Sequence, residues 1–167
     1  MKTDEIKKII KDLWLDFDKV TINKDNSIDY DGNVNIRGRG LDKIPLQFNI
    51  VNGDFDCSFN NLTSLKGVPR KCNDFDCHVN QLTSLEYAPI ECEYFNCRIN
   101  RLTSLEYAPI ECEIFNCESN KLTSLEYAPE KCEYFYYDNW DSIEKITYKE
   151  PAYILKQLKQ NRIDLFD

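Results

Sequence analysis

Apolar residues recur along most of the chain with a fixed spacing of 20 residues. The columns of this period are Phe55/75/95/115/135, Cys57/77/97/117, Cys72/92/112/132, Leu62/82/102/122, Leu65/85/105/125, Pro69/89/109/129 and the polar column Asn60/80/100/120. A fixed period in the twenties is typical of a solenoid, in which each unit buries its apolar residues against its neighbours. The pattern therefore predicts a stack of similar rungs, one for every 20 residues.

Each rung is expected to contribute one short parallel strand. The segment Val34-Asn35-Ile36 reads as a degenerate first repeat, so the strands are centred near residues 35, 56, 76, 96, 116 and 136. The prolines fix φ on the far side of each rung, where we expect extended or turn structure without helices. The asparagine column is predicted to satisfy backbone groups that would otherwise be buried unpaired where the chain leaves each strand.

Both ends depart from the period and are predicted to form caps. A helix over 4–15 has an apolar stripe, formed by Ile6, Ile9, Ile10, Leu13 and Trp14, and a hairpin over 20–30 follows it. At the other end Trp140, Ile143, Ile146 and Tyr148 break the period, and Pro151 opens a helix over 151–160. The expected organisation is an N-terminal cap (1–33), a solenoid (34–139) and a C-terminal cap (140–167).

The amino-acid sequence of the repeat resembles that of a known family. Cys72-x-x-Phe75-x-Cys77-x-x-Asn80-x-Leu82 follows the pattern L-x-x-L-x-L-x-x-N-x-L, with cysteine and phenylalanine at leucine sites. Together with the Leu-Thr-Ser-Leu segments, it resembles the 20-residue leucine-rich repeats of bacterial and phage proteins. The resemblance implies an α/β repeat solenoid with about six parallel strands on a concave face, and a phage accessory protein that binds or inhibits a bacterial host or defence protein.

Composition limits the class of protein. The chain is 42% apolar and 30% charged, which is enough to fill a core and excludes a disordered acidic tail. No run approaches the ~18 apolar residues of a membrane span. The first residues lack the apolar run of a signal peptide, so we expect a cytoplasmic protein whose eight cysteines are reduced core residues. Their spacing leaves disulfides between neighbouring rungs as an alternative.

Catalytic chemistry is not expected. The cysteines have no CxxC spacing and the chain has one histidine, so a zinc site is disfavoured. His78 follows Cys77 directly, but adjacent strand residues point to opposite faces, which argues against a Cys–His dyad. We therefore expect no enzyme activity, no cofactor and no metal. A thiol-based enzyme or redox sensor is the alternative.

Function is instead assigned to the outward positions of the strands, which change from rung to rung while the core columns hardly vary. The candidate partner-binding residues are Asp54, Asp56, Asp74, Asp76, His78, Tyr94, Asn96, Arg98, Ile114, Asn116, Tyr134 and Tyr136. The four aspartates form a cluster that would recognise a basic partner, be merely solvated, or bind a divalent cation. The later residues resemble a protein-binding hot spot. The alternative for Tyr134 and Tyr136 is that the C-terminal helix covers them.

The distribution of charge limits the classes of partner that the protein is expected to bind. The net charge is −8, and residues 54–139 hold 15 acidic and 7 basic residues, which is the whole excess. Direct nucleic-acid binding needs a basic stripe, which the sequence lacks. We expect a non-enzymatic module that binds a protein partner with a basic surface, without contact to a membrane. An acidic mimic of nucleic acid and a self-assembling structural element are further alternatives, and the sequence does not specify an oligomeric state.

Overall fold

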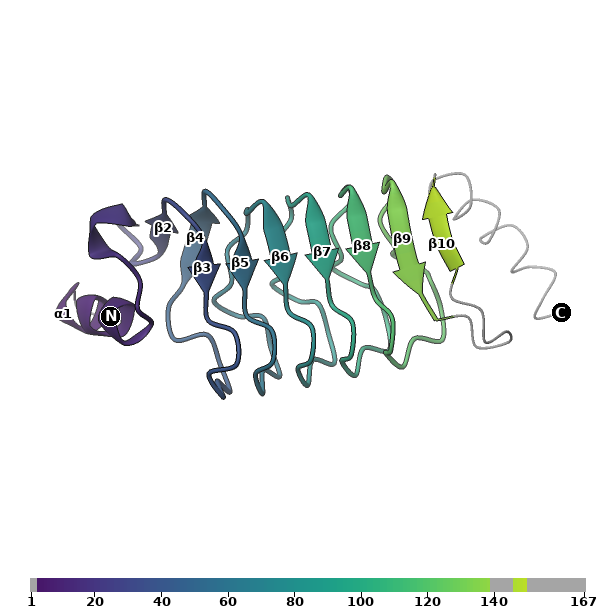
Figure 1. Cartoon of the computed structure of the whole chain (residues 1–167), viewed down its shortest axis with the longest axis horizontal. Coiled ribbons are helices and arrows are strands. Elements are labelled where there is room, and N and C mark those ends of the chain that lie inside the picture. The colour runs from purple at the N-terminus through teal and green to yellow at the C-terminus, as the bar shows by residue number, and fades with distance from the viewer. Residues whose placement is uncertain (1–2, 139–145, 150–167) are drawn as a thin grey trace, which may run out of the picture.

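The protein is a repeat solenoid made mostly of β-structure, as the computed structural model shows (Figure 1). The structure describes residues 3–138 and the backbone of 146–149. Its elements are α1 (Thr3–Asp12), the 3-10 helix η1 (Phe17–Lys19), β1 (Val20–Ile22), β2 (Ile28–Tyr30), β3 (Val34–Asn35), β4 (Phe48–Val51), β5 (Phe55–Asp56), β6 (Asp74–Asp76), β7 (Tyr94–Asn96), β8 (Ile114–Asn116), β9 (Tyr134–Tyr137) and β10 (Ile146–Lys149).

The main sheet contains one strand from each rung. Its order is β10-β9-β8-β7-β6-β5-β3, and the neighbours from β3 to β9 are parallel. The register pairs equivalent positions of successive rungs, so that Phe75 lies between Phe55 and Phe95. The prediction of a solenoid with about six parallel strands is therefore confirmed. On the far side, isolated parallel bridges such as Lys71 with Glu91 join the extended return segments.

A stack of phenylalanine rings forms the centre of the core. Phe75, Phe95 and Phe115 are fully buried, and the centroid of the Phe95 ring lies 5.2 Å from the centroid of each neighbouring ring. Burying each ring contributes on the order of 2–3 kcal/mol. Cysteine packs beside this stack because it is a small buried side chain and leaves room for the ring.

The cysteines are core residues. None of the eight forms a disulfide. Six are buried, and Cys92 and Cys112 are partly buried. Three thiols of one column reach a backbone carbonyl of the next rung; the Sγ atom of Cys77, for example, lies 3.4 Å from the carbonyl oxygen of Asn96. The disulfide alternative is not the arrangement found.

The asparagine column satisfies backbone groups as predicted. The side-chain amide of Asn80 donates to the carbonyl of Cys77 in its own rung (3.0 Å) and to the carbonyl of Cys57 in the preceding rung (3.1 Å). Its Oδ1 atom accepts from the amide of Leu62. Asn60, Asn100 and Asn120 repeat this arrangement. Among the described residues, no buried side-chain nitrogen or oxygen lacks a hydrogen-bond partner.

The N-terminal end contains the predicted helix and hairpin, with one strand that was not anticipated. β1 and β2 are antiparallel, and β2 pairs in parallel with β4 to make a second sheet of order β1-β2-β4. Strand β4 belongs to the return segment of the first rung. The cap and the solenoid share one continuous cluster of buried side chains, from Ile6 to Tyr137.

The N-terminal helix is shorter than predicted. It ends at Asp12, and Trp14 adopts a left-handed conformation with φ of 59°. The amide of Trp14 bonds the carbonyl of Lys11, and the amide of Leu15 bonds that of Ile10, which is a Schellman ending. Ile6, Ile10 and Leu13 are buried as expected, but Trp14 is 85% exposed and does not belong to the buried stripe.

The C-terminal cap falls largely outside the described residues, including Trp140, Ile143 and the helix predicted over 151–160. What is described is β10, which pairs antiparallel with β9 and extends the main sheet by one strand. The edge strand of the solenoid is thereby paired on its free side.

Candidate functional site

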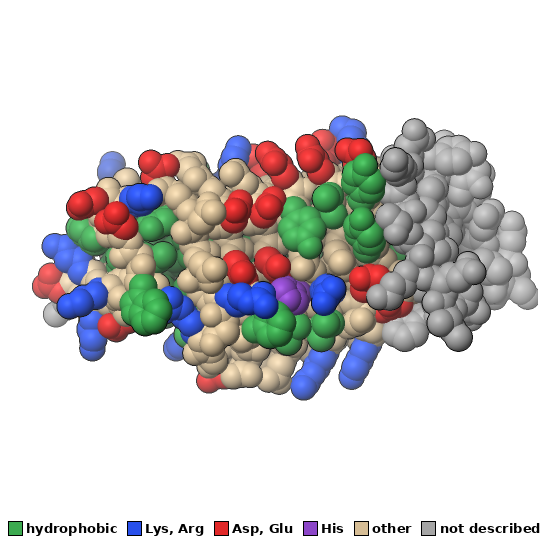
Figure 2. Space-filling model, viewed as in Figure 1, with side chains coloured by type: hydrophobic (Ala, Val, Ile, Leu, Met, Phe, Trp, Pro, Cys, Tyr) green, Lys and Arg blue, Asp and Glu red, His purple; other side chains and the backbone are tan. Residues whose placement is uncertain are grey.

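The four aspartates predicted as a cluster are brought together on the exposed face of the main sheet. Asp56 on β5 lies directly opposite Asp76 on β6, and Asp54 and Asp74 precede the phenylalanines of the same strands. They line a cavity of about 240 Å³ that extends to Asn33, Val34, Asn35, Phe55 and Tyr94. Figure 2 shows acidic side chains gathered in the middle of this face. We call this site the acidic cavity.

On β5 and on β6, the aspartate after the phenylalanine has a structural role that was not predicted. These residues are Asp56 and Asp76. The carboxylate of Asp56 accepts from the amide of Ser58, and that of Asp76 accepts from the amide of His78. The side chains of Asn35, Asn96 and Asn116 accept from the residue two positions later in the same way. In five of the six rungs, Asp or Asn in this column holds the turn after the strand, whereas the last rung has Tyr136 at this position.

The aspartates before the phenylalanines, Asp54 and Asp74, contact the neighbouring rungs instead of the turn. The Asp54 carboxylate accepts a hydrogen bond from the Asn33 side chain at 3.0 Å. The Asp74 carboxylate accepts a hydrogen bond from the backbone amide of Tyr94 on the next strand. Partial burial, together with the negative charges of Asp54 and Glu93, raises the pKa of Asp74 above its ordinary value. The cavity thus holds carboxylates that repel one another, and a cation would relieve that repulsion.

Next to the acidic cavity lies a row of large side chains that we call the apolar row. Tyr94, Ile114 and Tyr134 face one another on the adjacent strands β7, β8 and β9. All three are partly exposed. Burial and the nearby Asp76 raise the pKa of Tyr94 to about 12, so its hydroxyl is neutral and available as a hydrogen-bond donor. The row and the cavity meet at Tyr94.

The remaining candidate residues differ in accessibility. Asn116 and Tyr136 are partly exposed, and Arg98 is exposed. Asn96 is buried, and its amide donates to Asp76 at 3.3 Å. The pairing of β9 with β10 places a strand beside Tyr134 and Tyr136 in the sheet. Whether the predicted helix covers them concerns residues outside the described range.

His78 lies on the outer side of the sheet, but it is not free. Its Nδ1 atom is 2.5 Å from Oδ1 of Asp76, and its ring packs edge-on against Phe59 with the centroids 4.8 Å apart. The thiol of the adjacent Cys77 is fully buried on the opposite side, and it contacts a backbone carbonyl. Cysteine and histidine therefore do not form a dyad in this rung.

The buried thiols are held in their protonated form. Burial raises the pKa of Cys57, Cys77, Cys97 and Cys117 far above the ordinary value, and burial raises that of Cys92 to about 12. The exception is a hydrogen-bonded pair at the C-terminal end of the described solenoid. There the contact between the two side chains raises the pKa of Cys112 and lowers that of Cys132.

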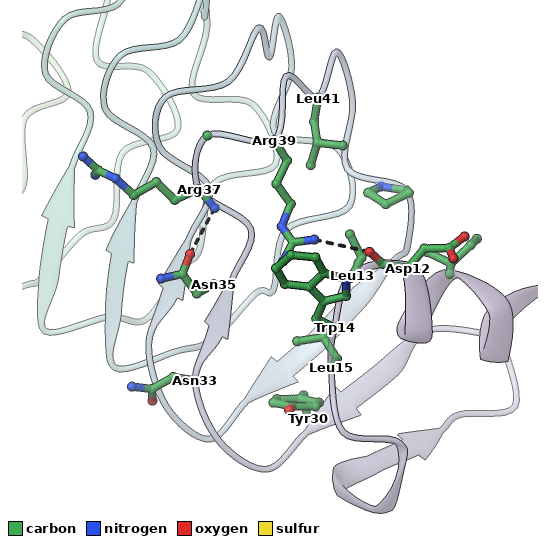
Figure 3. A pocket seen from close by; sticks show the side chains of 13 residues that line it. Asp12, Leu13, Trp14, Leu15, Tyr30, Asn33, Asn35, Arg37, Arg39 and Leu41 are labelled. Carbon is green, nitrogen blue, oxygen red and sulfur yellow. Dashed lines mark hydrogen bonds between the residues drawn. The ribbon is translucent and has the colours of Figure 1, made fainter.

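A second and larger cavity lies between the N-terminal helix and the first rung (Figure 3). Its volume is about 1000 Å³, and its walls include Leu13, Leu15 and Leu41. Inside it the guanidinium of Arg39 lies 4.7 Å from the Trp14 ring centroid and donates to the carbonyl of Asp12. Arg39 is therefore held by two contacts. Its stacking on the Trp14 ring accounts for the position of that exposed indole.

Three rungs have an apolar residue with a left-handed backbone at the turn after the strand, which was not predicted. Phe59, Val79 and Ile99 have φ between 52° and 55°, in the left-handed region. The equivalent residue of the first rung is Gly38, with φ of 64°. That glycine is the signal that could have identified the conformation, because glycine adopts a left-handed φ at little cost.

Neither metal ligation nor similarity assigns a function directly. Within residues 3–138, no three His, Cys, Asp or Glu side chains are placed to hold a metal ion. None of the helices in the described part of the chain has the length and apolar content of a membrane span. The sequence matches no family model, and searches of curated proteins and of solved structures found no match.

Proposed function

We propose that this protein is a non-enzymatic binding module of the leucine-rich-repeat type, which recognises a protein partner through the exposed face of its main sheet. One observation carries the proposal. Four carboxylates in a single cavity adjoin a row of partly exposed tyrosine and isoleucine side chains, and the two meet at Tyr94. A basic group bound in the cavity and an apolar side chain bound on the row would both be accommodated at once.

The partner is expected to present a basic surface. Like charges in the acidic cavity are brought together by the fold, and a lysine or arginine of the partner would lower their mutual repulsion. The excess of negative charge in residues 54–139 would also speed association at low ionic strength. Deeply buried, protonated thiols support a binding role over thiol chemistry. A narrower form of the proposal, a phage protein that binds or inhibits a bacterial host or defence protein, rests on the resemblance of the repeats alone.

The proposal is tested by capturing partners from a bacterial lysate on immobilised protein, followed by mass spectrometry. The double variant Asp54→Asn/Asp74→Asn removes two charges without touching the turn hydrogen bonds of Asp56 and Asp76. We expect it, and separately Tyr94→Ala, to lose the partner that the unmodified protein captures. The matched control is Glu86→Gln/Glu106→Gln, which removes the same charge from exposed positions outside the cavity.

The result that would overturn the proposal is equal capture by the unmodified protein and by both site variants. A partner that is lost equally with the control variant would point to nonspecific attraction by net charge, and it would likewise reject the site.

A further inference from the structure

Three apolar side chains occupy positions where folding alone favours glycine. Phe59, Val79 and Ile99 follow the strands β5, β6 and β7 by the same number of residues, and all three are in the left-handed region. Glycine stands at this place in the first rung and serine in the last complete one, as Gly38 and Ser119, with φ of 64° and 56°. The backbone thus keeps one conformation while the side chain changes.

These side chains are strained by their backbone, and two of them remain substantially exposed. A left-handed φ is a genuine outlier for bulky and β-branched residues. Phe59 is 44% exposed and Ile99 is 41% exposed. Glycine or serine would build the same turn, as the first and last of these rungs demonstrate. The turn itself therefore does not require the apolar side chains, although Phe59 also packs against His78.

Cationic side chains accompany them. The guanidinium of Arg37 lies 4.0 Å from the centroid of the Phe59 ring and donates to the hydroxyl of Ser58 at 2.8 Å, so it is fixed in place. Arg98, Arg101 and Lys121 are exposed at the same turns in the later rungs. Figure 2 shows basic and apolar side chains along one border of the face, beside the acidic ones. In the column that contains Ser58, His78 and Arg98, acids occur only at the C-terminal end, as Glu118 and Asp138. Asp56 and Asp76 contact Ser58 and His78 from the strands.

We call this border the turn edge, and we propose that it binds an extended acidic segment of a partner protein. Phe59 and Ile99 are two rungs apart, about 10 Å at the usual strand spacing, which roughly three residues of extended chain would span. Apolar side chains of the segment would contact Phe59, Val79 and Ile99. The carboxylates of the segment would pair with Arg37, Arg98 and Arg101, because guanidinium groups form strong hydrogen bonds with carboxylates.

This inference goes beyond the proposed function, because it concerns another surface and the opposite charge. The acidic cavity attracts basic groups, whereas the turn edge attracts acidic ones. One partner carrying both kinds of group, or two partners, would satisfy both surfaces. The two proposals are consequently tested by different variants and can fail separately.

The experiment is a selection of random twelve-residue peptides displayed on phage against the full-length protein. We expect the enriched peptides to be rich in Asp and Glu interspersed with apolar residues. A synthetic, fluorescein-labelled copy of the best peptide is then titrated with the protein, and its anisotropy is measured. We expect binding to weaken at least tenfold in the variant Phe59→Gly/Ile99→Gly and in Arg98→Gln/Arg101→Gln.

A structural role is separated from a binding role by the glycine variants. Because glycine suits a left-handed φ, Ile99→Gly alone should keep or raise the thermal midpoint while it weakens binding of the peptide. Phe59→Gly also removes the contacts of the Phe59 ring with His78 and Arg37, so its effect is judged by binding alone. The matched control is Tyr87→Gly/Tyr107→Gly, which makes the same change at two exposed left-handed residues outside the turn edge, and should bind the peptide normally.

Several outcomes would overturn the proposal. These are the absence of enriched peptides, enrichment without acidic residues, or equal affinity of the glycine variant for the acidic peptide. Enrichment of basic peptides that depend on Asp54 and Asp74 would support the acidic cavity and reject the turn edge. A labelled single strand of twelve thymidine nucleotides serves as a further probe. If it binds more tightly than the peptide, and if the same variants lose this binding, a protein segment is rejected as the occupant.

Discussion

The backbone amide of Leu62 donates a hydrogen bond to Oδ1 of Asn80, in the next rung, at a nitrogen–oxygen distance of 2.9 Å. Both residues are buried, so water does not compete for this contact. The same Asn80 side chain donates to carbonyls of its own rung and of the preceding rung. A single side chain therefore satisfies backbone groups in two rungs, and it does so without any helix on the far side of the solenoid.

Replacing such an asparagine should be costly. In Asn100→Ala, the amide of Leu82 loses its partner, and the carbonyls of Cys77 and Cys97 each lose one of two hydrogen bonds. The carbonyls keep the bonds from the side chains of Asn80 and Asn120. A buried group left unpaired costs about 1–3 kcal/mol, and each further hydrogen bond lost costs about 0.5–1.5 kcal/mol. We therefore expect the free energy of unfolding to fall by about 2–4 kcal/mol. Urea unfolding followed by circular dichroism measures it. The control, Asn61→Ala at an exposed position, should change stability by less than about 0.5 kcal/mol.

The turn aspartates make a different prediction, in which charge and hydrogen bonding are separated. Asp76→Asn keeps an oxygen that accepts from the amide of His78, as Asn96 does for Arg98 in the next rung. It should therefore leave the thermal midpoint within a few degrees of the original. Asp76→Ala removes the acceptor and should lower the free energy of unfolding by about 1–2 kcal/mol. Equal stability of the two variants would show that the turn does not depend on this side chain.

Two glycines with positive φ should respond differently to alanine. A Cβ on Gly67, whose φ is 105°, would lie 2.6 Å from the carbonyl oxygen of Leu46 and 2.9 Å from Cβ of Ile44. We expect Gly67→Ala to lower stability by about 2–4 kcal/mol, through both strain and overlap. Gly38 has φ of 64° and nothing within 4 Å, so Gly38→Ala should cost only about 1 kcal/mol. Thermal unfolding of the pair tests the difference.

The buried thiols predict a loss of stability in alkaline solution. The folded protein raises the pKa of Cys77 and Cys97 above the ordinary value of 9.0, and it raises that of Cys92 to about 12. The folded form thus retains protons that the unfolded form releases. The stability is fully present below about pH 9 and is lost as the pH rises above it.

The measurement is urea unfolding at several pH values between 8 and 11. Each fully buried thiol should contribute a slope of about 1.4 kcal/mol per pH unit above pH 9. In the variant Cys77→Ala/Cys97→Ala the slope should be smaller by roughly 2.7 kcal/mol per pH unit, although the variant is less stable at neutral pH. An unchanged slope would mean that these thiols do not cause the alkaline loss.

The repeat determines much of the fold, because each core column follows from one period and one packing environment. The repeat predicted the six parallel strands, the buried Phe95 and the asparagine column. The N-terminal hairpin, which lies outside the period, was predicted from the two short strands and the turn within 20–30. Strand β4 was not, since the apolar run of Phe48–Val51 lies where later rungs have no strand. The end of the helix was missed because the apolar stripe continues through Trp14, while the Schellman turn depends on a φ value that spacing does not reveal.

The candidate site was predicted in part for similar reasons. Alternation along strands correctly places the four aspartates on one face, so the acidic cavity follows from the sequence. The turn hydrogen bonds of Asp56 and Asp76 join residues two positions apart, which a search for charge clusters does not detect. The burial of His78 depends on the ring of Phe59 in the neighbouring rung, and the period treats both as surface positions.

The asparagine column makes the completion of each rung depend on the rung that follows it in the sequence. The amide of Leu62 finds its partner only when Asn80, 18 residues later, is in place. On a ribosome, a rung would therefore remain incomplete until most of the next one had emerged, and each arriving rung would lock the one before it. Folding would then follow the order of synthesis, one rung behind the growing end. Duplicating a whole 20-residue unit would preserve this order. One extra residue is also tolerated, because the first rung places Val34 opposite Phe55, 21 residues later, and keeps the bond from Leu41 to Asn60.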